Sequence, residues 1–266
     1  MTDDEIRARL KPVRCFLLDM DGTFYLGDQL IEGSLDFLNA LERTGRTARF
    51  LTNNSSRSAS VYAQKLARMG VRGQYQDVIS SAHAAAHYIL RTFPHQRGYL
   101  MGNPMLRSEL ESMGLVFTED DPTYVLAAFD TTLSYARLCC VCDLVRAGLP
   151  YIATHPDFNC PTETGFVPDL GAMMALIEAS TGRKADLILG KPYGGIVTEA
   201  LERTGFQLGE MAMVGDRLYT DVATGVRHGM TGILVLSGEA TMEDVAASDV
   251  QPDLIFGRLS DMIPYL

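Results

Sequence analysis

Short apolar runs that end in polar residues alternate with helix-like segments along most of this 266-residue chain. Residues 13–18 form one apolar run, which stops at a pair of aspartates, and residues 47–51 ("TARFL") form a second, which stops at "TNNSSR". Each run is followed by apolar positions at helical spacing, over 34–44 with Ser34 as the N-cap and over about 58–69. This alternation predicts a parallel sheet covered by helices on both faces.

The middle of the chain, about 80–182, has strands and helices of its own. The runs "GYLMG", "YVLAAFD" and "YIATHPD" predict strands, and helix-like segments lie before and between them. The pattern of a strand with a polar tip then returns in "DLILG", "MAMVGD" and "TGILVLSG". We therefore predict the α/β class: a Rossmann-like parallel-sheet core over 1–79 and 183–266, with a smaller α/β domain over 80–182 inserted into it.

The composition of the chain indicates which classes of partner and which cellular compartment to expect. The formal net charge of −10 would repel a polyphosphate backbone, which argues against a nucleic-acid partner. No apolar run approaches the ~18 residues of a membrane span, and the acidic N-terminus is unlike a secretory leader. Five cysteines without such a leader indicate a reducing compartment, so we expect a soluble, cytoplasmic protein.

Two groups of possible metal ligands have a simpler interpretation. The "CCVC" run lies in an apolar, helix-like segment and lacks paired Cys-x-x-Cys spacing, so we expect it to contribute to packing. His83 and His87 would share one face of a helix, where a metal pair is conceivable. No carboxylate lies among them at ligand spacing, which favours an alanine-rich packing face.

Polar side chains follow four of the predicted strands. In parallel sheets, ligands gather at the carboxyl ends of the strands, and this is where these residues fall. The residues at the four strand ends are Asp19 and Asp21; Thr52 and Asn53; Lys191; and Asp216 and Asp221.

The first strand end carries the groups for phosphoryl chemistry. A carboxylate held there, such as Asp19, can attack phosphorus and form an aspartyl-phosphate. Asp21, two residues on, is close enough to protonate the leaving oxygen and then to deprotonate the attacking water. Gly22 lets the chain turn and frees backbone N–H groups to face an anion.

Charge balance indicates what else such a site needs. Four carboxylates and a phosphate dianion repel one another unless a divalent cation and Lys191 offset them. Oxygen ligands with retained waters favour Mg²⁺ over Zn²⁺. The hydroxyl of Thr52 and an amide N–H of Asn53 can donate to the phosphoryl oxygens. Thr52 and Asn53 could instead cap the next helix, and Asp221 could be the N-cap of "VATGVRHG".

The ordered motifs "DMDGT", "LTNNSSR", "GKP" and "VGDRLYTD" resemble the four motifs of the haloacid dehalogenase superfamily of phosphohydrolases. The unit between the second and third motifs looks like the type IIA cap of its NagD-like, p-nitrophenylphosphatase-like branch, with "ATHPD" and "IEASTGR" as further points of likeness. The resemblance extends over most of the chain and implies an Mg²⁺-dependent phosphatase acting on a small phosphorylated metabolite.

The resemblance also implies individual roles. Asp19 would be the nucleophile and Asp21 the acid and base, while Thr52, Asn53 and Lys191 would hold the phosphoryl group. The resemblance further implies a set of groups around the metal. That set is Asp19, the backbone carbonyl of Asp21, Asp216 and, through the metal's waters, Asp221.

The cap departs from the family pattern in two places. His155 stands where the family usually has asparagine, and "VPDLG" where it has glycine-rich sequence. His155 and Asp157 are the positions expected to face substrate from the cap. The resemblance leaves open nucleoside monophosphates, sugar phosphates, phosphoglycolate and pyridoxal phosphate as substrates, and it admits a homodimer through the cap.

Two other functions stay open at this point. A phosphomutase or other phosphotransferase would use the same residues and pass the phosphoryl group to an acceptor other than water. A non-catalytic receiver-like module would be phosphorylated on Asp19 without turnover, although such a module needs no inserted cap. A dinucleotide-binding oxidoreductase is disfavoured, because no Gly-x-Gly-x-x-Gly follows the first strand.

Overall fold

In the computed structural model, which describes residues 1–162 and 165–266, strand β1 (Cys15–Leu18) lies inside a six-stranded sheet. The strand order is β15-β14-β13-β1-β4-β5, and β1 pairs in parallel with β13 and β4. All four residues of β1 are buried, as expected of a strand in a sheet covered on both faces. The other strands are β4 (Thr47–Thr52), β5 (Val78–Ser80), β13 (Met211–Gly215), β14 (Thr231–Val235) and β15 (Leu254–Phe256).

A second sheet has five strands in the order β12-β9-β8-β6-β7, again with parallel pairs. Its strands are β6 (Arg97–Met101), β7 (Val116–Phe117), β8 (Tyr124–Ala127), β9 (Tyr151–Ala153) and β12 (Leu187–Ile188). Two short antiparallel hairpins complete the strands: β2 (Tyr25–Leu26) with β3 (Gln29–Leu30), and β10 (Asn159–Thr162) with β11 (Gly165–Pro168). The predicted α/β class with a parallel-sheet core is confirmed.

Helices connect most of these strands, as parallel pairing requires. The α-helices are α1 (Asp3–Leu10), α2 (Ser34–Arg43), α3 (Ala59–Arg68), α4 (Ser81–Thr92), α5 (Pro104–Ser112), α6 (Tyr135–Arg146), α7 (Leu170–Thr181), α8 (Gly194–Thr204), α9 (Ala223–Arg227) and α10 (Met242–Ala247). Three 3₁₀ helices and one π-helix add to these: η1 (Gly73–Gln76), η2 (Leu208–Glu210) and η4 (Leu259–Tyr265) are 3₁₀, and η3 (Leu218–Val222) is π.

The chain divides into two compact units, each with a sheet and a hydrophobic core of its own. The first unit contains Met1–Thr52, Tyr62–Ile79 and Ala200–Leu266, and the second contains Asn53–Val61 and Ser80–Glu199. Buried aromatic and aliphatic side chains fill the core of the first unit, and a separate cluster around β6, β8 and β9, which includes Tyr99 and Tyr151, fills that of the second. The domain limits predicted at 79/80 and 182/183 stay a prediction.

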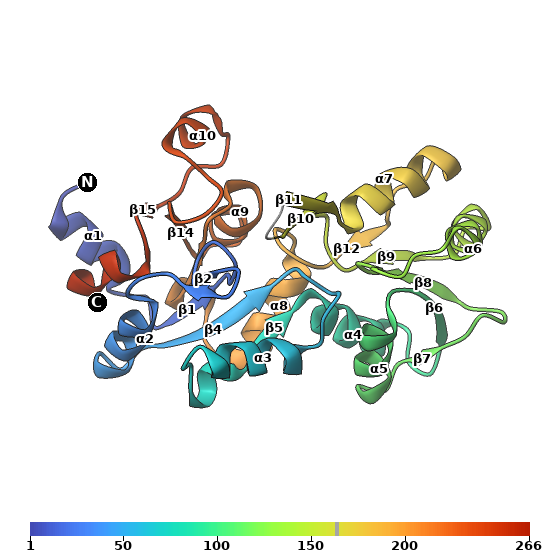
Figure 1. The fold of residues 1–266 in the computed structure, drawn as a ribbon, viewed down its shortest axis with the longest axis horizontal. Helices are drawn as coiled ribbons and strands as arrows, with labels where there is room; N and C mark the ends of the chain where they lie inside the picture. Colours follow the sequence, from blue (N-terminus) through green and yellow to red (C-terminus); the bar gives the residue numbers. More distant parts are fainter. Residues whose placement is uncertain (163–164) are drawn as a thin grey trace. The chain divides into compact units, whose positions relative to one another are not determined.

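Both chain ends belong to the first unit, where α1 packs beside η4 (Figure 1). The hydroxyl of Tyr265 donates a hydrogen bond of 3.1 Å to Asp3 Oδ1. Arg9 Nη1 lies 2.8 Å from Asp253 Oδ1, which joins α1 to the segment that leads into β15. These contacts tie the N-terminal helix to the C-terminal part of the sheet.

Two local expectations meet different outcomes. Ser34 is not the N-cap of α2, because Gly33, with a φ of 80°, takes that position. The Ser34 hydroxyl is buried and donates to Phe24 O over 2.9 Å instead, so tertiary contact overrides the capping preference. In the "CCVC" run on α6, Cys142 is buried in the core of the second unit, while Cys139 is exposed.

Among the residues described, no helix is both long and apolar enough to cross a membrane.

Candidate active site

The carboxyl ends of β1 and β13 carry the first group of candidate residues. Asp19 follows β1 directly and Asp216 follows β13, and these neighbouring strands pair from Cys15 with Met211 to Leu18 with Val214. The Asp19 N–H continues this ladder and donates to Val214 O over 2.9 Å. Together with Asp221 on η3, the two residues offer carboxylate oxygens that all lie within 4.8 Å of one another. The structure therefore brings the three predicted carboxylates together.

Because two of these carboxylates are buried, ionising the cluster costs free energy unless a positive charge lies beside it. Asp216 and Asp221 are 4% and 0% exposed. Burial raises the pKa of Asp216 to about 7, and the charges of Asp19 and Asp221 add to the effect. Asp216 Oδ2 accepts the Glu239 N–H over 2.8 Å, but the buried Oδ1 has no hydrogen-bond partner. An orphaned carboxylate oxygen among other oxygen ligands fits a divalent cation such as Mg²⁺.

Glycines make the room that these carboxylates occupy. A Cβ on Gly238 would lie 2.1 Å from Asp216 Oδ2, and one on Gly215 would lie 2.2 Å from Asp221 Cγ. Gly22 has a φ of +81°, and a Cβ there would lie 2.3 Å from Asp216 Oδ2. The sequence predicts Gly22 for its turn and its free N–H groups, but it does not predict this close approach or the part played by Gly215 and Gly238. Gly238 could have been noticed, because it follows a predicted strand in "TGILVLSG".

Asp21 lies on the loop after β1, beside the β2–β3 hairpin. The loop is held by a hydrogen bond of 2.8 Å from Gly22 N–H to Tyr25 O. Burial raises the pKa of Asp21, the Lys65 ammonium lowers it in part, and Asp19 raises it again. A raised pKa suits a carboxyl group that must hold a proton as a general acid.

Lys65, on α3, is a further residue that the sequence analysis missed. Its ammonium donates to Gly27 O over 2.7 Å, lies 3.4 Å from Asp28 Oδ1 and sits 4.0 Å from the centre of the Tyr25 ring. It therefore holds the hairpin and places a positive charge near Asp21. A lysine in the last turn of a helix gives no signal of this contact in the sequence.

Thr52 completes the candidate residues of the first unit. It is the last residue of β4, the strand that pairs with β1 on the side opposite β13. Because β4 runs parallel to β1, with Leu18 opposite Phe50, Thr52 ends its strand at the same edge of the sheet as Asp19, and it is 6% exposed. It does not begin the next helix, since α3 starts at Ala59. Asp221 likewise is not the N-cap of α9, a position that Val222 occupies.

Asn53, Asp157 and Lys191 meet within the second unit. The Asn53 amide nitrogen donates to Asp157 Oδ1 and Oδ2 over 3.0 and 3.2 Å and to Lys191 O over 3.0 Å. Asn53 Oδ1 accepts the Lys191 N–H over 2.7 Å. Both amide hydrogens are therefore engaged inside the unit, so a bond from Asn53 to a phosphoryl group would have to come from its backbone N–H.

His155 is fully buried in the second unit. Its ring nitrogens lie 3.8 Å from Asp157 Oδ2 and 3.6 Å from Asp169 Oδ1, beyond hydrogen-bonding distance. Asp169 precedes α7 and accepts the Leu170 N–H over 2.6 Å. His155 thus packs between two acidic side chains, and the predicted contacts of His155 and Asp157 with substrate stay predictions.

The two histidines of α4 each have a carboxylate partner from another element. His83 Nε2 lies 3.2 Å from Glu109 Oε1 on α5, and His87 Nδ1 lies 2.6 Å from Glu199 Oε2 on α8. His83 is buried as expected of a packing face, whereas the His87 side chain is 41% exposed. Both partners are too distant in the chain for spacing to have revealed them.

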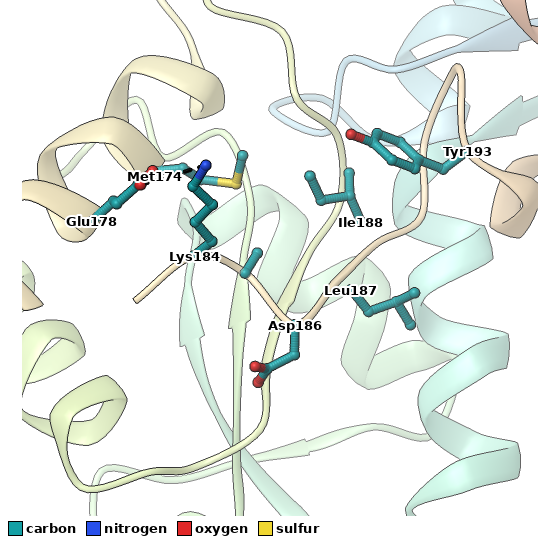
Figure 2. Close-up of a pocket in the computed structure, with 8 residues that line it drawn as sticks. Met174, Glu178, Lys184, Asp186, Leu187, Ile188 and Tyr193 are labelled. Atoms are coloured by element: carbon teal, nitrogen blue, oxygen red, sulfur yellow. Dashed lines mark ion pairs between the residues drawn. The ribbon is translucent and has the colours of Figure 1, made fainter. Parts of the chain in front are cut away.

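A shallow pocket of about 380 Å³ also lies on the second unit (Figure 2). Its walls come from α7 and from the segment around β12, and include Met174, Ile188 and Tyr193. Lys184 and Glu178, which also line it, form an ion pair 3.6 Å long. None of the predicted catalytic or phosphate-binding residues lines this pocket, so the carboxylate cluster remains the candidate active site.

Two family models match the chain. The haloacid dehalogenase-like hydrolases match over residues 16–116, and a HAD-hydrolase-like family matches over residues 188–262. The first match begins in β1, and the second includes the segment that carries Lys191, Asp216 and Asp221.

Relatives and solved structures agree with these matches. The chain is 35% identical to an acid sugar phosphatase of Staphylococcus aureus over 97% of this chain and 99% of that protein. A 4-nitrophenylphosphatase from Thermotoga maritima superposes with a TM-score of 0.93 at 47% identity, covering 96% of this chain and 98% of that one. A glycerol phosphate phosphatase from Mycobacterium tuberculosis, in complex with magnesium, has a TM-score of 0.85 at 31% identity, with 94% and 76% covered.

Proposed function

This chain belongs to the haloacid dehalogenase-like hydrolases and is a phosphatase, and we propose that it hydrolyses small phosphomonoesters with Mg²⁺ through an aspartyl-phosphate. The observation that carries the proposal is the convergence of Asp19, Asp216 and Asp221 at one edge of the first sheet. The orphaned, buried oxygen of Asp216 supports a cation there. The magnesium complex of the glycerol phosphate phosphatase supports the choice of Mg²⁺.

In the proposed reaction, Asp19 attacks phosphorus while Asp21 gives its proton to the leaving oxygen. Asp21 then takes a proton from the water that hydrolyses the aspartyl-phosphate. The raised pKa of Asp21 supports this double role, because the carboxyl group can hold a proton near neutrality more easily than an exposed aspartate can. Asp19 returns to its free carboxylate at the end of the cycle.

The remaining residues bind and orient. Thr52, a backbone N–H of Asn53 and the Lys191 ammonium would hold the phosphoryl oxygens. Asp19, Asp216, the backbone carbonyl of Asp21 and, through water, Asp221 would hold the metal. Bound Mg²⁺ would offset the repulsion between the carboxylates and the phosphate and polarise a phosphoryl oxygen.

The names of the relatives guide the choice of substrates. Sugar phosphates, glycerol phosphates and 4-nitrophenyl phosphate are the first compounds to test, since the relatives described above are named for these compounds. Comparing free phosphate release with phosphorylated product separates hydrolysis from transfer to another acceptor. A homodimer through the second unit, and the lack of nucleic-acid and membrane partners, stay predictions.

The test of the mechanism is Asp19→Asn. We expect a folded protein whose turnover falls by about a thousandfold or more, because an amide cannot form the acyl-phosphate. Phosphate release from 4-nitrophenyl phosphate with Mg²⁺ measures the loss, and circular dichroism confirms the fold. Asp36→Asn removes an exposed carboxylate from α2 and should leave turnover unchanged. Hydrolysis by Asp19→Asn at the wild-type rate would refute the mechanism.

A further inference from the structure

The side chain of Asn53 holds both backbone polar groups of Lys191. Its Oδ1 accepts the Lys191 N–H over 2.7 Å, and its Nδ2 donates to the Lys191 carbonyl over 3.0 Å. One side chain therefore pairs with the peptide groups on either side of the lysine Cα, much as a neighbouring strand would. This pairing restrains the backbone of Lys191 on both sides of the atom from which its side chain extends.

Asp157 fixes which way the Asn53 amide points. The second hydrogen on Nδ2 is shared between the two Asp157 oxygens, at 3.0 and 3.2 Å. A flipped amide would turn its oxygen towards that carboxylate and its NH₂ group towards the Lys191 N–H. The Asp157 charge opposes that flip and keeps the acceptor facing the lysine N–H.

The surroundings leave this arrangement little freedom. Asn53 is 4% and Lys191 3% exposed. Gly190, next to the lysine, lets the chains approach, because a Cβ there would lie 2.5 Å from Asn53 Oδ1. The Ser81 hydroxyl donates to Asn53 O over 2.5 Å and fixes the backbone of the asparagine itself. The pairing between Asn53 and Lys191 is thus buried, and neighbouring groups fix its position.

We propose that Asn53 is a positioning residue for Lys191, oriented by Asp157, so that this network and not a side-chain contact with substrate explains both residues. This inference rests on the proposed function, in which the Lys191 ammonium binds the phosphoryl group. A shift of about 1 Å in a binding group can cost about a hundredfold in rate. A side chain that holds the lysine backbone on both sides therefore affects catalysis without touching substrate.

The experiment compares three variants and one control variant with the wild type. Asn53→Asp is nearly isosteric, keeps an acceptor for the Lys191 N–H, loses both donors and puts a second carboxylate against Asp157. We expect kcat to fall about tenfold or more, and inhibition by inorganic phosphate to weaken about tenfold. Asp157→Asn still offers an oxygen to Asn53 but loses the charge that opposes the flipped amide, so we expect its kcat to fall, by less than that of Asn53→Asp.

The double variant Asn53→Asp/Asp157→Asn exchanges carboxylate and amide, which restores a bond between the two positions. We expect it to recover at least about threefold of the activity lost in Asn53→Asp, with the rest of the loss due to the missing bond to the Lys191 carbonyl. Ser55→Ala is the matched control: its buried hydroxyl contacts Thr154 Oγ1 and Phe129 N in the same unit, so stability should fall while kcat holds.

Thermal unfolding of every variant separates folding from positioning, with kinetics measured well below the unfolding temperature. Wild-type kcat and phosphate inhibition in Asn53→Asp would overturn the inference. A double variant no better than Asn53→Asp would also overturn it, because Asp157 would then play no part. If the wild type turns over and Asp19→Asn does not, these outcomes bear on the network alone. An inactive wild type would instead refute the proposed function.

Discussion

Asp19 and Asp21 are two residues apart, yet their surroundings give them different chemistry. Asp19 ends a strand and offers its carboxylate to the cluster with Asp216 and Asp221. Asp21 sits on the following loop, where burial raises its pKa and Lys65 lowers it in part. The raised pKa of Asp21 suits a general acid, which must hold a proton before it gives it to the leaving oxygen. The spacing of the pair follows from the sequence, but the moderating charge of Lys65 does not.

Lys65→Met should therefore shift the pH dependence of catalysis. Removing the ammonium takes away a charge that favours the Asp21 carboxylate, so the pKa of Asp21 rises. The general acid then stays protonated to higher pH, so the alkaline limb of the kcat profile should move to higher pH. Lys65→Arg keeps the positive charge and should retain the wild-type profile. An alkaline limb that stays in place in Lys65→Met would show that Lys65 does not act on Asp21.

At the scale of elements, the loop between β14 and α10 supports the site from outside the predicted motifs. The Ser237 hydroxyl donates to Gly22 O over 2.8 Å, and the Glu239 N–H donates to Asp216 Oδ2 over 2.8 Å. Gly238 lies between them, where any Cβ would press on the Asp216 carboxylate. The loop after β14 thus joins the loops after β1 and β13, which hold the candidate metal ligands.

Gly238→Ala tests this loop. The added methyl group should push the Asp216 carboxylate out of place, and we expect the Mg²⁺ concentration for half-maximal activity to rise about tenfold or more. Magnesium titration of phosphatase activity measures the change. Gly209→Ala is the matched control, because a Cβ at Gly209 meets nothing within 4 Å. A Gly238→Ala enzyme with the magnesium requirement of the wild type would show that the loop accommodates the methyl group without displacing the Asp216 carboxylate.

The strands and helices with strong apolar patterns could be predicted from the sequence. The run at 13–18 forms β1, and the repeated strand-with-polar-tip pattern locates β4, β13 and β14. The β10–β11 hairpin has half-buried or exposed strands and gave no such signal. Contacts such as Gly33 displacing Ser34 at the start of α2 depend on tertiary packing, which local preference cannot reveal.

The candidate site, like the fold, could be predicted from the sequence only in part. The four motifs identified the residues that carry charge, because such side chains are unusual at the ends of apolar runs. The sequence could not show that the Asn53 side chain bonds to Asp157 and Lys191, since these partners are more than a hundred positions away. It also could not show that His155 is buried between two aspartates. Residue type can therefore be read from the pattern, while side-chain orientation depends on the fold.

For the whole molecule, the carboxylate cluster predicts that stability depends on pH and on magnesium together. Burial raises the pKa of Asp216 to about 7 in the folded protein, against an ordinary value of 3.8. A raised folded pKa stabilises the fold fully below the unfolded value, and this stabilisation is lost as pH rises towards 7. The metal-free protein should therefore lose stability from this group between about pH 4 and pH 7.

Asp216→Asn isolates this contribution. In EDTA, the variant should lose less stability than the wild type between pH 5 and pH 8, by on the order of 2 kcal/mol, because an amide does not ionise. With Mg²⁺ at about a hundred times its dissociation constant, the wild type should gain roughly 2.7 kcal/mol, and the variant much less. Denaturant unfolding of both proteins at both pH values, with and without Mg²⁺, measures the stability lost between the two pH values and the stability gained with Mg²⁺. Equal pH dependence of the two proteins in EDTA would mean that the pKa of Asp216 is not raised in the folded protein. An equal gain with Mg²⁺ would mean that Asp216 does not bind the metal.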